Sequence, residues 1–199
     1  MRYSKVGLTD VVELDPFCLR LRIVDCVPNR IEYYNFVNGG YFWHHASGET
    51  YPLGILVDQG DVLSDRQPHG KPAGTLIIYK DGNVAVKELL SIKSEKNVWF
   101  AISGCTILPK INMTAAGFTG VYSDIGRTTL RPVIGYRKKD KKIIIAVRPS
   151  SSITRAQITL KNLGCDFGIT LDAGGSTALQ VKGKKLHNTT RRLNNVITW

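Results

Sequence analysis

Most of the chain alternates short apolar segments, rich in Ile and Val, with turns that contain Gly, Asn or Asp. This pattern predicts β-strands. The expected strands cover residues 17–23, 54–58, 75–79, 84–86, 99–103, 133–136, 143–147 and 167–171. In 17–23 the odd-numbered apolar side chains share one face, whereas Arg20 and Arg22 share the other face and are expected to be solvated.

Helical periodicity is convincing only in residues 152–163, where apolar side chains recur every three or four positions. Ser151 or Ser152 can cap this helix, and Gly164 can end it. The sequence therefore predicts an α+β fold with a mixed, mostly antiparallel multi-stranded sheet and few packing helices. No Pro- or Ser-rich linker divides the chain, so a single domain over residues 1–199 is expected.

The chain is strongly basic, with 27 Lys and Arg against 16 Asp and Glu, a net charge of +11. Such a charge favours an anionic partner. The densest basic run, residues 137–142, is interrupted by Asp140 and lies between two predicted strands, which is typical of a solvated hairpin turn. A small anionic ligand is therefore preferred to nucleic acid.

Four scattered cysteines, Cys18, Cys26, Cys105 and Cys165, show no spacing typical of a zinc site or a disulfide framework. No apolar stretch approaches the roughly 18–20 residues that a bilayer crossing needs. The basic N-terminus is not followed by a continuous apolar segment, so no secretion signal is visible. These features predict a cytoplasmic protein with reduced thiols.

Two glycine turns carry the candidate chemistry. Residues 172–176 read Asp-Ala-Gly-Gly-Ser at the end of a predicted strand, where a fixed carboxylate is followed by backbone that a ligand can approach closely. Residues 38–42 read Asn-Gly-Gly-Tyr-Phe, where a polar side chain and two glycines precede rings that can stack on a sugar. Either turn alone is also common as a structural feature.

Together these turns resemble motifs of the phosphodiester glycosidase family. The resemblance extends to Phe-Ala-Ile-Ser-Gly at 100–104, Arg-Pro-Val-Ile-Gly at 131–135 and Arg-Arg-Leu-Asn-Asn at 191–195, in the family's order. Four residues depart from the family pattern. Pro132 and Ala173 replace a Thr and a Gly, and Arg148-Pro149 stands where many members have Asp-Gly.

The resemblance implies hydrolysis of a sugar 1-phosphodiester at the anomeric carbon. Asp172 is then the candidate carboxylate, which could stabilise positive charge, activate water or attack directly. Arg131 is the candidate phosphate clamp, since a guanidinium can meet two phosphate oxygens at once. A structural ion pair is the alternative role for Arg131. His44 could shuttle a proton near neutral pH.

The remaining candidates are expected to bind substrate. Asn38, Gly39 and Gly40 would line the sugar pocket through backbone donors and the Asn amide. The predicted contacts on the other side come from Gly174, Gly175, Ser176, Arg148, Arg191 and Asn195. No metal ligand set and no cofactor motif is recognised.

The sequence favours two functions, and nucleic-acid binding, which rests on the net charge alone, remains open as a third. The first is a hydrolase acting on a small nucleotide-derived or sugar phosphodiester, with a viral protein that destroys a nucleotide immune messenger as one form of it. The second is a non-catalytic protein that sequesters such a ligand, which Arg148 in place of an acid and the excess positive charge favour.

Overall fold

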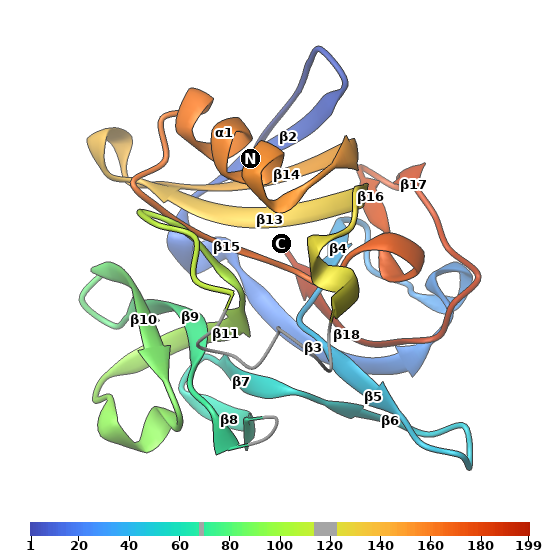
Figure 1. Ribbon diagram of the computed structural model, residues 1–199, viewed down its shortest axis with the longest axis horizontal. Helices are drawn as coiled ribbons and strands as arrows, with labels where there is room; N and C mark the ends of the chain where they lie inside the picture. Colours follow the sequence, from blue (N-terminus) through green and yellow to red (C-terminus); the bar gives the residue numbers. More distant parts are fainter. Residues whose placement is uncertain (68–69, 114–122) are drawn as a thin grey trace.

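The computed structural model describes residues 1–67, 70–113 and 123–199, which form three larger antiparallel sheets, a two-stranded hairpin and one α-helix (Figure 1). The six-stranded sheet contains, in spatial order, β1 (Arg2–Val6), β2 (Thr9–Leu14), β14 (Lys142–Ser151), β13 (Thr129–Arg137), β15 (Phe167–Thr170) and β12 (Thr106–Leu108).

Two five-stranded sheets complete the framework. One contains β10 (Val84–Leu89), β9 (Ala73–Tyr79), β11 (Val98–Gly104), β7 (Gly54–Asp58) and β8 (Asp61–Arg66). The other contains β17 (Lys184–His187), β16 (Leu179–Val181), β4 (Phe36–Asn38), β18 (Leu193–Thr198) and β3 (Arg20–Cys26). The hairpin is made of β5 (Phe42–His44) and β6 (Thr50–Pro52). The predicted sheet-rich α+β class is confirmed.

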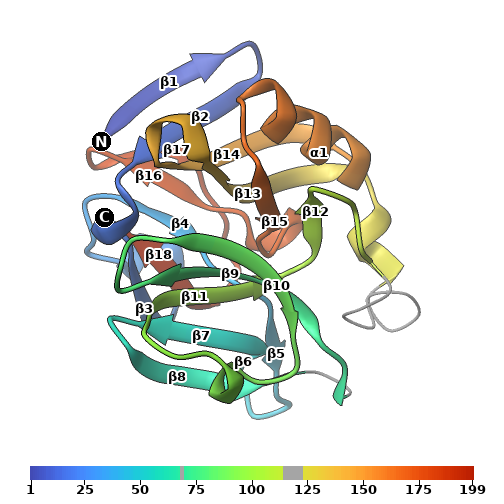
Figure 2. The same cartoon turned by 90° about the vertical axis from the view of Figure 1, so that its left-hand side faces the viewer.

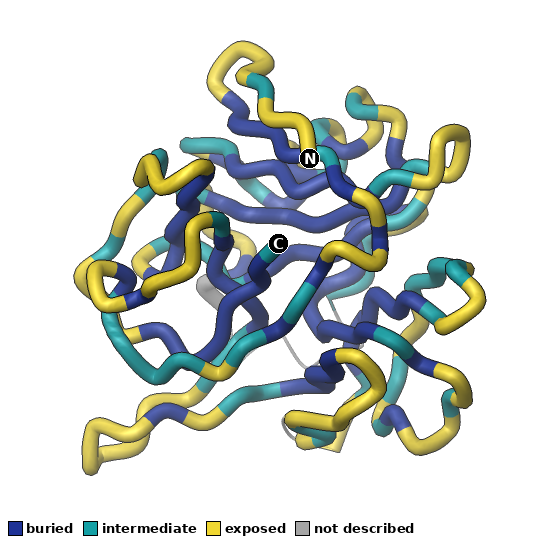
Figure 3. The backbone as a smooth tube through the Cα atoms, turned by 180° about the vertical axis from the view of Figure 1, so that it is seen from behind, coloured by how far each residue is buried: buried dark blue, intermediate teal, exposed yellow. Residues whose placement is uncertain are grey.

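The three larger sheets pack their apolar faces into one core, and Figure 2 shows them stacked around it. Val147 from the six-stranded sheet, Leu76 from the second sheet and Ile197 from the third are all fully buried in the same cluster. Figure 3 shows the consequence, with buried central strands and exposed turns. Burial of this apolar surface is the main stabilising contribution to the fold.

Helix α1 (Ile153–Asn162) packs on the other face of the six-stranded sheet. The Ser152 hydroxyl accepts a hydrogen bond from the Arg155 backbone N–H, and Gly164 adopts a φ of 78° after the last turn. Ile153, Ala156 and Leu160 are the buried positions. The predicted helix is confirmed, because its caps and its apolar stripe are local properties of the sequence.

The predicted strand over 17–23 is partly wrong. Pro16 begins a 3-10 turn over Pro16–Cys18, where its fixed φ is compatible with a helical turn, and the strand starts only at Arg20. Leu21 is buried as expected, but Phe17 and Ile23 are 43% and 46% exposed. Since β3 is an edge strand of its sheet, only part of its apolar face is covered.

The two arginines of β3 are not merely solvated, which corrects a second expectation. Arg22 Nη1 lies 2.6 Å from Asp58 Oδ2 and joins the edge of one five-stranded sheet to the other. The guanidinium of Arg20 lies 5.4 Å from the Trp99 ring centroid, a cation–π contact. Residues 138–141 form the expected exposed turn between β13 and β14, but Arg137 at the end of β13 is not simply solvated, because its guanidinium pairs with Glu13 and Asp140.

Glu95 gives a testable contribution to stability. Its carboxylate accepts hydrogen bonds from Tyr79 Oη at 2.6 Å and from Lys87 Nζ at 2.9 Å, and these contacts lower the pKa of Glu95. The stabilisation is therefore present above the unfolded-state pKa of Glu and is lost as the pH falls through the lower folded-state pKa. At pH 7, Glu95→Gln should reduce the free energy of unfolding by about 1–2 kcal/mol.

Urea unfolding of the wild type and the Glu95→Gln variant at pH 7 and at progressively lower pH tests this prediction. The difference between the two proteins should shrink in acid, because the wild-type carboxyl is then neutral as well. A difference that is unchanged across this range would mean that the carboxylate charge is not the cause.

Candidate functional site

The two glycine turns, residues 38–42 and 172–176, contact each other next to a pocket that both help to line. Strand β4 ends at Asn38, whose Nδ2 donates to the backbone oxygen of Asp172 at 2.6 Å. The same amide accepts from the Ala178 N–H at 3.1 Å, and the Asp172 N–H donates to the Gly39 oxygen at 3.0 Å. The turn that carries Asp172 is therefore held at both ends by the turn that contains Asn38.

Asn195, from β18, locks the same turn from the other side. Its Oδ1 accepts from the Gly40 N–H at 2.8 Å, and its backbone oxygen accepts from the Gly39 N–H at 3.0 Å. A side chain at position 39 would overlap Asn195 Oδ1, so this close approach requires glycine. Residues 38–40 of the glycine turn at residues 38–42 are therefore buried and connect β4 to β18.

The pocket next to this glycine turn has a volume of about 170 Å³. It is lined by Tyr41, Phe42, His44, Ile125, Arg131, Asp172, Ala173 and Arg191. A carboxylate, two guanidinium groups and aromatic rings therefore share one cavity, with contributions from strands of different sheets and from turns. Such an arrangement suits a ligand that combines an anionic group with a flat apolar face.

Arg131 is 1% exposed and is held by backbone oxygens. Its Nε donates to Ser151 O at 3.2 Å, and its Nη2 donates to Ile125 O at 2.8 Å and Arg127 O at 2.7 Å. Both two-pronged faces of a guanidinium include an Nη2 hydrogen, and both of these are already directed to carbonyls. Arg131 therefore supplies a fixed positive charge beside the pocket, and its role as a two-pronged phosphate clamp stays a prediction.

Arg191 is the exposed cation of the pocket. Its Nη1 donates to Ser176 Oγ at 3.1 Å, and its guanidinium packs over Gly175 in the 3-10 turn η7 (Gly174–Ser176). Ser176 is fully buried, so its hydroxyl is a fixed acceptor that holds the Arg191 guanidinium in place. This arrangement keeps the guanidinium at the pocket wall, where it can meet an anionic group of a ligand.

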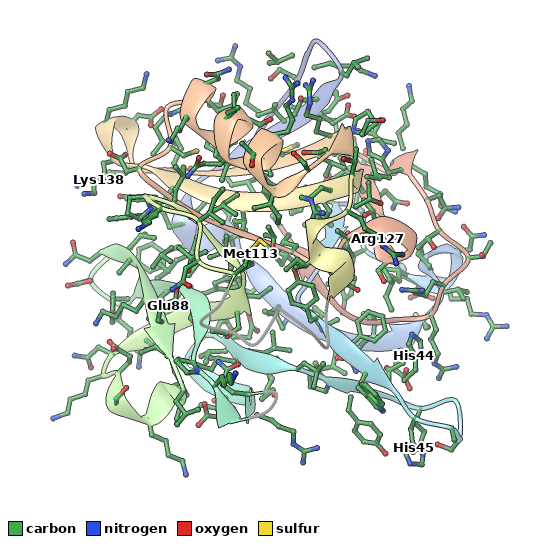
Figure 4. The ribbon with its side chains drawn as sticks, in the orientation of Figure 1. His44, His45, Glu88, Met113, Arg127 and Lys138 are labelled. Carbon is green, nitrogen blue, oxygen red and sulfur yellow. The ribbon has the colours of Figure 1, made fainter. Side chains whose placement is uncertain are left out.

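Aromatic side chains form another part of the wall. Phe42 and His44 lie on the same face of β5, with ring centroids 5.0 Å apart in an edge-to-face arrangement. The Tyr41 hydroxyl lies 2.9 Å from Thr170 Oγ1, and burial raises the pKa of Tyr41, so the phenol is neutral. Figure 4 shows His44 and His45 on the hairpin, with His45 further from the body of the protein.

The structure brings the predicted residues together in three groups. The pocket lining contains Asp172, Arg131, His44 and Arg191. The contact between β4 and β18 contains Asn38, Gly39, Gly40 and Asn195. The 3-10 turn that contacts Arg191 contains Gly174, Gly175 and Ser176. Asn38 and Asn195 are 1% and 2% exposed and their amides position backbone, while their expected contact with substrate stays a prediction.

Arg148 lies elsewhere, which corrects its expected place in the site. It lines a separate cavity between β2 and helix α1, together with Thr9 and Thr159. Its Nη1 donates to Thr9 Oγ1 at 3.0 Å. Although Arg148 pairs with Arg131 in the β13–β14 register, the two guanidinium groups line different cavities.

Ile125, in the 3-10 turn η5 (Ser123–Gly126), is a pocket residue that the sequence did not indicate. It has no motif or periodic neighbour that marks it. Within residues 1–67, 70–113 and 123–199, no group of three or more His, Cys, Asp or Glu side chains gathers as a metal site. The same part of the chain contains no helix that is long and apolar enough to span a membrane.

Similar folds occur in solved structures. The catalytic domain of zebrafish N-acetylglucosamine-1-phosphodiester alpha-N-acetylglucosaminidase, auto-inhibited by its pro-peptide, is 18% identical, with a TM-score of 0.76. That match covers 96% of this chain and 76% of the zebrafish chain. A hypothetical protein from Synechocystis is 13% identical, with a TM-score of 0.68 over 99% of this chain and 60% of that chain.

No curated protein matches the sequence significantly. Residues 33–198, by contrast, match the family described as phosphodiester glycosidase. This match includes both glycine turns, the strand that carries Arg131 and the C-terminal segment that carries Arg191 and Asn195. The resemblance noted from the motifs is therefore confirmed, and the chain belongs to the phosphodiester glycosidase family.

Proposed function

We propose that this protein hydrolyses the glycosidic bond between the anomeric carbon of a sugar and a phosphate in a small phosphodiester. The observation that carries the proposal is the placement of one carboxylate, Asp172, with two guanidinium groups, Arg131 and Arg191, around one pocket. Family membership supports the same reaction class.

In this reaction the bond between the anomeric carbon and the phosphate oxygen breaks, and a water oxygen bonds to that carbon. The leaving group is a phosphomonoester, a weak base, so it needs little protonation. Arg191 would contact the phosphate, while the buried charge of Arg131 would stabilise the negative charge that develops there. His44 is placed at the pocket wall and could transfer a proton.

Asp172 would act on the sugar side of the breaking bond. Three roles are compatible with its place: it could stabilise positive charge at the anomeric carbon, accept a proton from water, or form a bond to that carbon. The backbone N–H and oxygen of Asp172 both bond to the glycine turn at residues 38–42, so the backbone that carries the carboxylate is fixed in place.

The proposed substrates are nucleotide-derived or sugar phosphodiesters. The pocket volume of about 170 Å³ is below the roughly 300–1,000 Å³ of sites that enclose a drug-sized ligand. The pocket would therefore hold the sugar–phosphate bond that breaks, while the remainder of the substrate stays outside it. The net charge of +11 would draw in such anions. A cytoplasmic location, also part of this proposal, would make nucleotides the natural candidates.

Hydrolysis in ¹⁸O-labelled water tests the proposal. Wild-type protein would be incubated with a panel of sugar 1-phosphodiesters, a nucleotide sugar and a ribosyl-linked dinucleotide, and the phosphate product would be analysed by mass spectrometry. Cleavage at the anomeric carbon leaves this phosphate unlabelled, whereas cleavage at phosphorus labels it. A labelled phosphate would contradict the proposed reaction.

The same incubation separates catalysis from sequestration, the second candidate, which the excess positive charge favours. Intact ligand released on heating would indicate a binding protein. Arg148 lends less support to sequestration than its sequence position suggested, because its guanidinium lines a different cavity from that of Asp172.

A further inference from the structure

Strand β3 contains a β-bulge next to two segments that carry pocket residues. Its pairing with β18 shifts between Leu193, opposite Cys26, and Asn195, opposite Ile23, so β3 has one extra residue there. Asp25 lies in this bulge with a φ of 40°, a conformation that non-glycine residues other than Asn and Asp seldom adopt. Bulges re-aim side chains and are common near functional sites.

The bulge directs the Asp25 carboxylate to two segments that carry pocket residues. Oδ1 accepts from the Thr50 hydroxyl, and Thr50 lies directly opposite His44 in the β5–β6 hairpin. Arg192 donates to both carboxylate oxygens, from Nε at 2.8 Å and from Nη2 at 3.0 Å. Arg192 follows Arg191 in the chain.

A second contact reinforces this connection. The Asn194 amide, 1% exposed, donates to the Thr50 oxygen at 3.1 Å and to the Thr50 hydroxyl at 3.0 Å. The segment with Arg191 is thereby fastened to the hairpin with Phe42 and His44, and the Asp25 carboxylate bridges the two. Its bonds to Arg192 and Thr50 lower the pKa of Asp25, so it is ionised at neutral pH.

We infer that Asp25, which does not line the pocket, is a positioning residue that holds the histidine-bearing hairpin against the arginine-bearing segment and so sets substrate affinity. The inference rests on the proposed function. Arg131 lies in β13 and Asp172 in the turn after β15, whereas the Asp25 carboxylate bonds to Thr50 and Arg192. Loss of Asp25 should therefore raise KM more than it lowers kcat.

Two variants remove the Asp25 carboxylate or its charge without adding strain at the positive φ of this residue. Asp25→Gly tolerates the positive φ and removes the carboxylate, while Asp25→Asn also tolerates it and removes only the charge. Asp15→Asn is the matched control, because Asp15 forms an exposed ion pair with Lys142 at 2.6 Å, away from the pocket lining. Hydrogen exchange of segments 42–52 and 188–194 measures how firmly the hairpin and the Arg191 segment are held together. Steady-state kinetics on a hydrolysed phosphodiester measures KM and kcat.

We expect Asp25→Gly to increase exchange in both segments and to raise KM about fivefold, the upper range for a partly exposed ion pair. Asp25→Asn should show a smaller effect, and Asp15→Asn none. Arg192→Gln should reproduce the Asp25→Asn defect, and the double variant should be no worse than either single one, because both remove the same ion pair.

Exchange equal to the wild type in Asp25→Gly would overturn the inference, as would faster exchange with an unchanged KM. If the wild type hydrolyses none of the phosphodiesters, exchange still decides whether Asp25 holds the wall. Faster exchange in Asp25→Gly would then support that role while the proposed reaction fails.

Discussion

Replacement of Asp172 by Asn should lower turnover of a phosphodiester substrate by at least about 100-fold while the fold is retained. The amide lacks the negative charge that each of the three possible roles of Asp172 requires. It keeps the oxygen that accepts from the Ala173 N–H at 3.0 Å, so the turn is preserved. Steady-state kinetics and thermal unfolding of the variant and the wild type provide the measurement.

The comparison between binding and turnover makes this prediction specific. The guanidinium groups of Arg131 and Arg191 are unchanged in Asp172→Asn, so affinity for an inert phosphodiester analogue should stay within a few-fold of the wild type. Near-normal turnover would refute the catalytic role. Loss of turnover together with a lower melting temperature would instead point to a structural role for the carboxylate.

Replacement of Gly39 by Ala should strongly destabilise the fold. The added Cβ would overlap Asn195 Oδ1 and lie 3.0 Å from Asn195 Cγ and 3.2 Å from Asn195 O. Relief of this overlap displaces the amide that accepts from the buried Gly40 N–H. Overpacking and an unsatisfied buried donor together should cost about 2–5 kcal/mol, measured by urea unfolding.

Gly126→Ala is the matched control, since Gly126 has no positive φ and, among residues 1–67, 70–113 and 123–199, its added Cβ would meet only Met113 Cε, at 3.9 Å. This variant should unfold within about 0.5 kcal/mol of the wild type. A double variant, Gly39→Ala with Asn195→Ala, removes the overlapping oxygen and should be less destabilised than the sum of the two single variants. Strict additivity would show that Asn195 is not the obstacle.

The family and the site region could be predicted because they depend on short motifs in a fixed order. The Asn-Gly-Gly and Asp-Ala-Gly-Gly turns mark backbone that must approach another chain segment closely, and the structure joins them through Asn38 and Asp172. What the motifs do not reveal is the use of each polar atom. The amides of Asn38 and Asn195 hold backbone across 134 and 155 residues of sequence.

By itself, the sequence determined the strand-rich pattern, the capped helix over Ile153–Asn162 and the two glycine turns, because these follow from interactions between near neighbours in the chain. Only the tertiary structure decided which charges meet. Arg131 and Arg148 are partners across β13 and β14, yet one lies at the Asp172 pocket and the other between β2 and helix α1. The physical reason is that long side chains follow the packing around them, and that packing exists only after distant strands have paired.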